Sequence, residues 1–354
     1  VYGNVSGITA DKPLVLDLHV QNCATDTKGI DHLVAGVTGK SPGLSAKAPG
    51  IKALLNASLR GPLDKLKLNA DLSSNAGYVR TRLDVLDLTK KNHPLLIGGN
   101  LETTNLDLSK FMKKDLVHEL SLETKLNAKL RGSKGPELAI DTLKINRLNF
   151  KGYDYSKILA TGDLSKQQFN GRIISQDPNL NFLFQGIFTF SPKTQNAVYQ
   201  FYANVGHADL HELKLDLREN ATLSLQTNAN FNRTGSGMLL GNVNIRNVRL
   251  TAEDEIHDIG DINLISRSTA NEYRINLSSK IANGQYVGSA PVNDFVRDLM
   301  GITAKRELPS LFEDSRYEWS GETYKLNFEF EDARGISGFI KPGLYIDNDT
   351  ELVL

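Results

Sequence analysis

Hydrophobic and polar residues alternate along most of the chain. In residues 120–130 every second position is leucine, alanine or threonine, with Ser, Glu, Lys or Asn between them, and residues 221–231 alternate in the same way. Successive side chains of a β-strand point to opposite faces of a sheet, so this period of two predicts strands with one apolar face. At eleven residues each, these two strands exceed the usual length of about five or six residues.

Shorter alternating stretches lie between turn-forming residues. The stretches are residues 66–72, 79–85, 143–145, 182–184, 188–190, 243–245 and 324–330. The turn signals include Gly61-Pro62, residues 73–77, Asn283-Gly284 and Lys341-Pro342-Gly343. Strands that follow one another through short turns predict an antiparallel meander, because parallel neighbours would need long crossover connections.

One strand-and-turn segment recurs along the chain. Leu55-Asn56-Ala57-Ser58-Leu59-Arg60-Gly61 returns 71 residues later as Leu126-Asn127-Ala128-Lys129-Leu130-Arg131-Gly132, with six of seven positions identical. A third, degenerate copy begins at Thr227 and reaches Gly235, and a second marker precedes each copy by roughly twenty residues. That marker reads Asp31-His32-Leu33, Asp107-Leu108-Ser109-Lys110-Phe111 and Asp209-Leu210-His211-Glu212-Leu213.

Two repeating markers in step predict an architecture built by stacking similar units. We expect residues 1–354 to form one continuous repeat-built β-groove. Its approximate units are residues 30–106, 107–208 and 209–314, followed by terminal strands in residues 315–354. The predicted fold class is mostly all-β: an elongated antiparallel sheet folded into a U-shaped groove, with a few short helices.

Helical signals are confined to three segments. Residues 107–118 predict one short helix with Asp107 or Ser109 as its N-cap. Residues 291–300 give the clearest signal, with apolar residues at helical intervals: Val292, Phe295, Val296 and Leu299. A further turn is expected at residues 310–314. We expect these helices to cap the β body or to cover a sheet edge.

An apolar sheet face has to be covered, and the predicted helices are too few to cover a sheet of this length. The sheet either closes on itself as a sandwich or barrel, or folds lengthwise into a trough that holds acyl chains. Small and medium residues recur on the predicted inward face, among them Ala57, Ala128, Ala229, Thr124 and Thr227. A densely packed core would normally use larger side chains there, which favours the open trough.

The predicted lining of this trough comes from the two clearest alternating stretches. We expect acyl chains to lie against Leu122, Leu126, Ala128, Leu130, Leu223, Leu225, Ala229 and Phe231. The alternative is that these residues pack only against one another.

The composition does not indicate a charged partner. Lysine plus arginine equals aspartate plus glutamate, 41 against 41, so no net charge favours nucleic acid. The single cysteine, Cys23, excludes an internal disulfide and a cysteine-rich zinc site. No stretch reaches the ~18–20 apolar residues of a membrane-spanning helix.

The sequence contains no complete motif for a catalytic or metal site. Residues 36–41, Gly-Val-Thr-Gly-Lys-Ser, resemble part of a phosphate-binding loop, but Val34 stands where the first glycine is needed and Pro42 follows where a helix should begin. His207, Asp209 and His211 share one face of a strand without a fourth ligand nearby. No nucleophile elbow and no His-Glu-x-x-His sequence occurs. We therefore expect a protein that is not an enzyme, with no catalytic residue, metal or cofactor.

The repeated strand, followed by alternating strands and an Asp-Leu-x-x-Leu/Phe step, resembles the TamB/AsmA-like family of envelope proteins in the form seen in Bacteroidota. The resemblance is carried by residues 53–72, 98–111, 126–190 and 208–250. It implies a periplasmic β-taco, a U-shaped sheet whose hydrophobic trough runs from the inner to the outer membrane. Family members have an N-terminal helical anchor and are associated with phospholipid transport or outer-membrane protein assembly. We expect this chain to correspond to a middle segment of such a protein, with the anchor outside it.

The leading hypothesis is non-catalytic conduction of phospholipid, or of another acyl-chain ligand, between the two membranes. The implied setting is the periplasm, with the inner membrane reached through an anchor outside this chain and an outer-membrane barrel as a further partner. One alternative is a scaffold that offers strand edges to barrel proteins during their assembly. Another is an extracellular adhesin or glycan-binding array, indicated only by Trp319 with Tyr317 and Tyr324.

Overall fold

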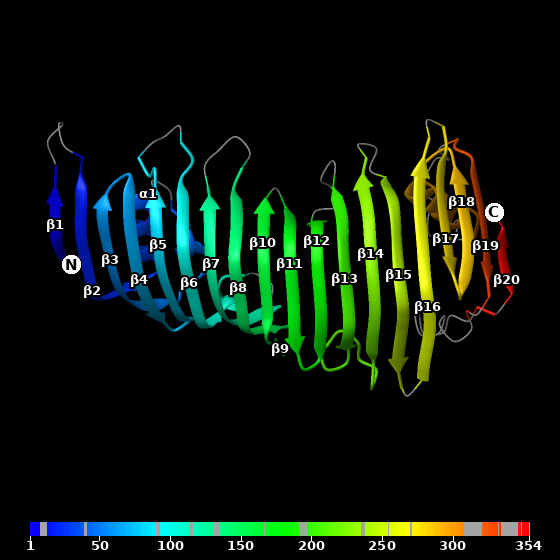
Figure 1. The fold of residues 1–354 in the computed structure, drawn as a ribbon, viewed down its shortest axis with the longest axis horizontal. Helices are drawn as coiled ribbons and strands as arrows, with labels where there is room; N and C mark the ends of the chain where they lie inside the picture. The colour runs from blue at the N-terminus through cyan, green and yellow to red at the C-terminus, as the bar shows by residue number, and fades with distance from the viewer. Residues whose placement is uncertain are drawn as a thin grey trace. The chain divides into compact units, whose positions relative to one another are not determined.

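The structure is a computed structural model of an antiparallel β protein (Figure 1). It describes residues 1–7, 13–38, 41–89, 93–112, 116–130, 135–165, 167–190, 197–234, 238–253, 255–269, 271–307, 321–331, 333, 346–347 and 349–353. Over these residues twenty strands form one sheet that is not closed into a barrel, and helices are few. The predicted all-β fold class is confirmed.

The elements follow one another along the chain with few interruptions. The strands are β1 (Tyr2–Ser6), β2 (Val15–Asp26), β3 (Lys52–Pro62), β4 (Lys65–Ser74), β5 (Gly77–Leu86), β6 (Leu96–Asp107), β7 (Val117–Lys129), β8 (Glu137–Phe150), β9 (Tyr153–Tyr155), β10 (Ile158–Ser165), β11 (Gln168–Asp177), β12 (Leu180–Thr189), β13 (Val198–Asp209), β14 (Thr222–Arg233), β15 (Leu239–Ala252), β16 (Glu255–Ser268), β17 (Tyr273–Ser279), β18 (Ala282–Gly288), β19 (Tyr324–Phe330) and β20 (Thr350–Val353). The helices are α1 (Thr27–Thr38), α2 (Leu44–Lys47), the 3-10 helix η1 (Leu108–Lys110) and α3 (Val292–Glu307).

The chain divides into two compact units. The N-terminal unit comprises Val1–Gln185 with Glu212–Asp216, and the C-terminal unit comprises Gly186–His211 with Leu217–Leu354. In the N-terminal unit the strands pair in chain order from β1 to β8, β8 pairs with both β9 and β10, and β10 pairs with β11. In the C-terminal unit β13 to β20 pair in chain order. All of these pairings are antiparallel, as the meander prediction requires.

The three copies of the repeated segment fall on β3, β7 and β14. Of their glycines, Gly61 lies in β3, whereas Gly132 and Gly235 are outside the described residues. The accompanying marker lies at or soon after the end of a long strand in each case. Asp31 is in α1 after β2, Asp107 is the last residue of β6, and Asp209 is the last residue of β13.

Three strands share a bulge built around an asparagine. One extra residue enters β2, β6 and β15, and in each bulge an asparagine takes a left-handed conformation: Asn22 (φ 48°), Asn105 (φ 48°) and Asn247 (φ 53°). The asparagine N–H donates to a side chain of the neighbouring strand. The acceptors are Asn56 Oδ1 at 2.8 Å, Ser121 Oγ at 2.9 Å and Asp261 Oδ1 at 3.0 Å. Such bulges bend a strand and increase its twist.

The helix predictions had mixed outcomes. The helix expected from residue 291 is confirmed and extends further, as α3. The helix predicted over residues 107–118 is wrong: Asp107 caps only the single turn η1, and residue 117 already begins β7, where pairing with both neighbours satisfies the backbone. The helices α1 and α2 had no prediction. Residues 310–314 lie outside the described part of the chain.

The expected turn at Asn283-Gly284 is also wrong, because both residues lie inside β18. Gly284 is opposite Phe328 on β19, and a Cβ at Gly284 would come within 2.5 Å of the Phe328 ring. The glycine therefore makes room for a cross-strand aromatic ring.

In the described part of the chain, buried apolar residues form small clusters. One cluster joins Leu66, Val85 and Leu95, and a second joins Ala48, Ile51 and Ala76. A third, in the C-terminal unit, joins Val248, Ile259 and Ala333. Among the described residues, no helix is both long enough and apolar enough to span a bilayer.

The left-handed asparagine makes a testable contribution to stability. Asn105→Val should lower the free energy of unfolding by about 1–2 kcal/mol, because a β-branched residue strongly disfavours a left-handed conformation. Asn105→Gly should cost less, since glycine adopts positive φ freely. Urea denaturation followed by circular dichroism measures both changes.

The neighbouring Thr104 provides the control. It lies in the same bulge and is exposed, but its φ is not positive. Thr104→Val should therefore leave the urea midpoint nearly unchanged. The same midpoint for Thr104→Val and Asn105→Val would contradict the role given to the asparagine.

Candidate functional site

One face of the N-terminal unit is apolar across successive strands, because the pairing register aligns the inward residues. One row, from β2 to β8, contains Leu18, Leu59, Leu68, Leu83, Gly99, Leu126 and Ile140. The adjacent row, from β2 to β10, contains Val20, Ala57, Ala70, Thr81, Leu101, Thr124, Leu143 and Ala160. We call this surface the apolar face.

The apolar face is only partly buried. Along β7 the inward residues Leu122, Thr124, Leu126 and Ala128 are of intermediate exposure, and the outward residues between them are exposed. The inward residues Leu59 of β3 and Leu68 of β4 are likewise half-buried. Side chains of a filled core would be buried almost completely, so the protein itself covers this face incompletely.

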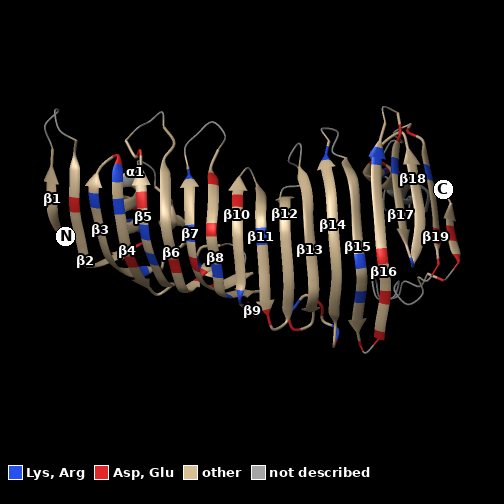
Figure 2. Cartoon of the chain, viewed as in Figure 1, with Lys and Arg blue, Asp and Glu red and all other residues tan. Residues whose placement is uncertain are grey.

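The opposite face of the same strands is charged. Figure 2 shows acidic and basic residues interspersed along β3–β8. The Arg80 guanidinium bridges Asp71 at 2.7 Å and Glu102 at 3.6 Å, across three neighbouring strands. Hydrogen bonds from the Tyr78 hydroxyl and from Arg80 hold the pKa of Asp71 below its ordinary value. These pairs are solvent-exposed and add little stability, so their main effect is to mark this face as the one toward water.

The C-terminal unit has an apolar face of its own. Its best-aligned row, from β13 to β17, contains Phe201, Ala229, Val243, Leu264 and Leu277. Aromatic rings enlarge this face at β12 and β13, where the Phe188 ring lies 5.3 Å from Tyr199 and 6.0 Å from Phe201, measured between centroids.

Helix α3 covers part of the C-terminal unit. The Phe295 ring lies 5.7 Å from Tyr286 and 5.3 Å from Tyr324, between centroids. The Tyr324 hydroxyl donates to Asp298 Oδ2 at 2.9 Å, and Asp298 is 1% exposed. Burial raises the pKa of Tyr286, whose hydroxyl donates to the Ala290 carbonyl at 2.5 Å. This end of the unit is therefore closed by specific contacts.

The predicted groove residues fall into two sets. Leu122, Leu126 and Ala128 lie on the apolar face of the N-terminal unit, and Leu130 follows the end of β7 and is 46% exposed. Leu223, Leu225, Ala229 and Phe231 lie on β14 in the C-terminal unit, where Ala229 is the most buried at 9% exposed. Whether these residues contact a ligand remains a prediction.

Helix α1 lies over one part of the apolar face and borders a partly open cavity that the sequence patterns did not predict. The cavity has a volume of about 360 Å³ and lies between Ile30 and Leu33 of α1 and the inward residues of β2–β5. The strand residues that line it are Leu18, Val20, Leu55, Ala57, Ser58, Leu59, Leu68, Ala70, Leu72, Val79 and Thr81. Apolar residues at positions 30, 33 and 34 were the available signal for α1, but Gly29 and Gly36 weaken it.

Buried polar groups fix α1 to α2. The Asp31 carboxylate, 5% exposed, accepts hydrogen bonds from the N–H groups of Leu44 and Ser45 at 2.8 and 2.9 Å. It also accepts one from the Ser45 hydroxyl at 2.6 Å. The Thr27 hydroxyl donates to the Ala48 carbonyl at 3.2 Å. We call α1 and α2 together the helical hairpin.

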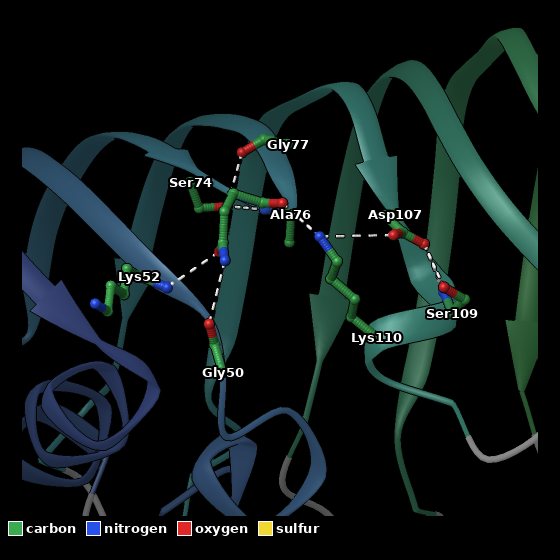
Figure 3. Close-up of polar contacts among 9 residues, drawn as sticks. Gly50, Lys52, Ser74, Ala76, Gly77, Asp107, Ser109 and Lys110 are labelled. Carbon is green, nitrogen blue, oxygen red and sulfur yellow. Dashed lines mark hydrogen bonds and ion pairs between the residues drawn. The ribbon is translucent and has the colours of Figure 1, made fainter.

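The segment that follows α2 is joined to the sheet through the β4–β5 turn (Figure 3). The Asn75 side chain accepts from the Lys52 N–H at 3.1 Å and donates to the Gly50 carbonyl at 3.1 Å. From η1, Lys110 Nζ donates to the Asn75 carbonyl at 2.5 Å and lies 3.7 Å from Asp107 Oδ2. The segment that follows α2 is therefore held at the same point as η1.

The other sequence candidates do not assemble into a site in the described residues. His211 Nδ1 is 3.0 Å from the Arg218 carbonyl oxygen, and no group of three or more His, Cys, Asp or Glu in the described chain is placed to hold a metal. Residues 36–38 end α1, and residues 39–40 are outside the described part. Of the three aromatic residues noted for glycan binding, Tyr324 packs against α3, while Tyr317 and Trp319 are not described.

Comparisons of the chain with protein-family models, with curated proteins and with solved structures gave no match.

Loss of the Asp31 carboxylate should loosen the helical hairpin. In Asp31→Ala the N–H groups of Leu44 and Ser45 lose their acceptor, so amide exchange in residues 27–47 should accelerate by about tenfold or more. Hydrogen bonds from Ser45 hold the pKa of Asp31 below its ordinary 3.8. The stabilisation of the helical hairpin by the ionised Asp31 carboxylate is therefore complete above pH 3.8. It is lost as the pH falls through the lowered pKa of Asp31.

Hydrogen exchange followed by mass spectrometry measures both effects. Asp84→Ala is the matched control, because Asp84 is an exposed acid on the outward side of β5. It should leave exchange in residues 27–47 unchanged. Wild-type exchange rates there in Asp31→Ala would show that the carboxylate does not hold the hairpin.

Proposed function

We propose that each apolar face forms a groove that binds and conducts the acyl chains of phospholipids, without catalysis. The single observation that carries this proposal is the half-burial of the aligned apolar rows, as along β7. Apolar area left in water costs roughly 25 cal/mol per Å². A continuous apolar surface of this kind is typical of a binding site.

The two faces of the sheet suit an extended lipid path. Hydrocarbon tails would lie along the rows that contain Leu126 and Leu143, and polar head groups would stay in water. Transfer along the rows needs no bond to be made or broken, because equivalent apolar positions recur from strand to strand. The lipid would move down its own gradient between two membranes.

The resemblance to the TamB/AsmA-like family supports the setting of this proposal. The partners we propose are therefore phospholipid, the inner membrane through an anchor outside this chain, and an outer-membrane barrel protein. The location we propose is the periplasm.

A second candidate is a scaffold that adds strands of a client barrel protein to its sheet edge. The observation in its favour is β1, which is exposed at all five positions and contains neither lysine nor proline. Edge strands are usually protected by such residues, so β1 is suited to pairing with another strand. Crosslinking of β1 to a barrel client in a preparation without bound lipid would favour this candidate over lipid conduction.

A charge on the apolar face should abolish lipid binding. In Leu143→Asp a carboxylate replaces a half-buried leucine of β8, so affinity for a fluorescent phosphatidylethanolamine should fall by about tenfold or more. Leu126→Asp on β7 should have the same effect. Fluorescence titration and extraction of co-purified phospholipid provide the measurements.

The adjacent Thr142 gives the control. It is exposed on the outward side of β8, opposite Lys125, so Thr142→Asp should bind lipid like the wild type. Circular dichroism must show the same strand content in all variants. An unmodified chain that binds no phospholipid, or equal binding by both β8 variants, would overturn the proposed function.

A further inference from the structure

Helix α1 does not pack closely against the apolar face. Its backbone approaches β2 and α2 most closely, and the 360 Å³ cavity separates its apolar side from β3–β5. Leu33 is 48% exposed although it lines this cavity, which is otherwise walled by apolar side chains. A helix that packs against a sheet normally buries such a leucine, so the gap has room for something else.

The described lining of the cavity is almost entirely apolar and offers little hydrogen bonding to a polar ligand. Of the described residues that line it, only Ser58 and Thr81 are polar. The Ser58 hydroxyl accepts a hydrogen bond from the Asn69 side chain at 3.3 Å, and the Thr81 hydroxyl donates to the Asn100 carbonyl at 3.1 Å. A carboxylate, a head group or a peptide backbone placed there would lose its hydration without a replacement partner.

We propose that this cavity binds one hydrocarbon chain and that the helical hairpin is its lid. The inference rests on the proposed function, because it assigns one acyl chain of a lipid to a defined place on the apolar face. A water-sized group occupies roughly 30 Å³, so the cavity accommodates about twelve such groups, and a methylene is of similar size. The site therefore takes a single chain of about a dozen carbons with its polar end outside.

Hydrogen bonds hold the lid in place, and apolar side chains of the lid line the cavity. Thr27 and Asp31 hold the hairpin through hydrogen bonds, whereas Ile30 and Leu33 lie over the cavity. A seated chain would bury Leu33 and add apolar contacts between α1 and the sheet. Binding of the chain and closure of the lid therefore stabilise each other.

Dodecanoic acid is the probe, and calorimetric titration of the full chain measures its affinity. Ile30→Ser removes an apolar contact from the lid and should weaken binding by about tenfold. His32→Ser is the control on the same helix, because His32 is exposed and does not line the cavity. Ala70→Phe, on the floor of the cavity, should abolish binding by filling it. Dodecanoic acid should also slow amide exchange in residues 27–47 of the wild type.

Leu143→Asp separates this inference from the proposed function, because Leu143 is on the apolar face but not in the cavity lining. It should leave dodecanoic acid affinity within about twofold of the wild type. Equal affinity in wild type, Ile30→Ser and Ala70→Phe would overturn the inference, as would loss of binding only in Leu143→Asp. Phospholipid binding without dodecanoic acid binding would also overturn it, while the proposed function stands. If neither dodecanoic acid nor phospholipid binds, both this inference and the proposed function are overturned.

Discussion

The register of strand pairing is the constraint on which the structure depends. Leu68 lies opposite Leu59 on one side and Leu83 on the other, while on the opposite face of the sheet Arg80 lies opposite Asp71 and Glu102. A slip of one residue in any strand would turn its charged side chains onto the apolar face. The aligned apolar rows on one face of the sheet and the exposed ion pairs on the other face therefore specify the same register.

The bulges preserve this alignment where the strands bend. An extra residue in a strand would turn every later side chain of that strand to the opposite face of the sheet. A β-bulge avoids this, because two residues of one strand together lie opposite one residue of its partner. At Asn105 this is what happens, and the displaced N–H finds an acceptor in Ser121. Cross-strand side chains play the same part at Asn22 and Asn247. The strand therefore bends, and its apolar side chains stay on the same face of the sheet before and after the bend.

In the described part of the chain, the helical segments cover the apolar faces only locally. The helical hairpin stands over β2–β5, and α3 closes one end of the C-terminal unit through Phe295. Between such segments the apolar rows stay half-buried, as on β7. A protein that covers its apolar surface in places and leaves the rest partly open is suited to a ligand that is itself long and apolar. This physical match links the repeat architecture to the lipid hypothesis.

Much of the fold was predictable from the sequence. Alternation with period two identified β4, β5, β7 and β14, because side-chain direction in a strand is a local property. It also placed Leu122, Leu126 and Ala128 on one face. It failed at Asn283-Gly284, where a glycine accommodates the Phe328 ring across the sheet, and at residues 107–118, where strand pairing overrides helical spacing.

The amino-acid sequence by itself determined many of the strands, their two faces and the antiparallel order. Only the tertiary structure decided which residues meet across strands, where the asparagine bulges bend the sheet, and that α1 stands off the apolar face. Asp31 shows the reason. Its partners Leu44 and Ser45 are more than ten residues away, and no local pattern reports a hydrogen bond that forms only when two helices and a sheet come together.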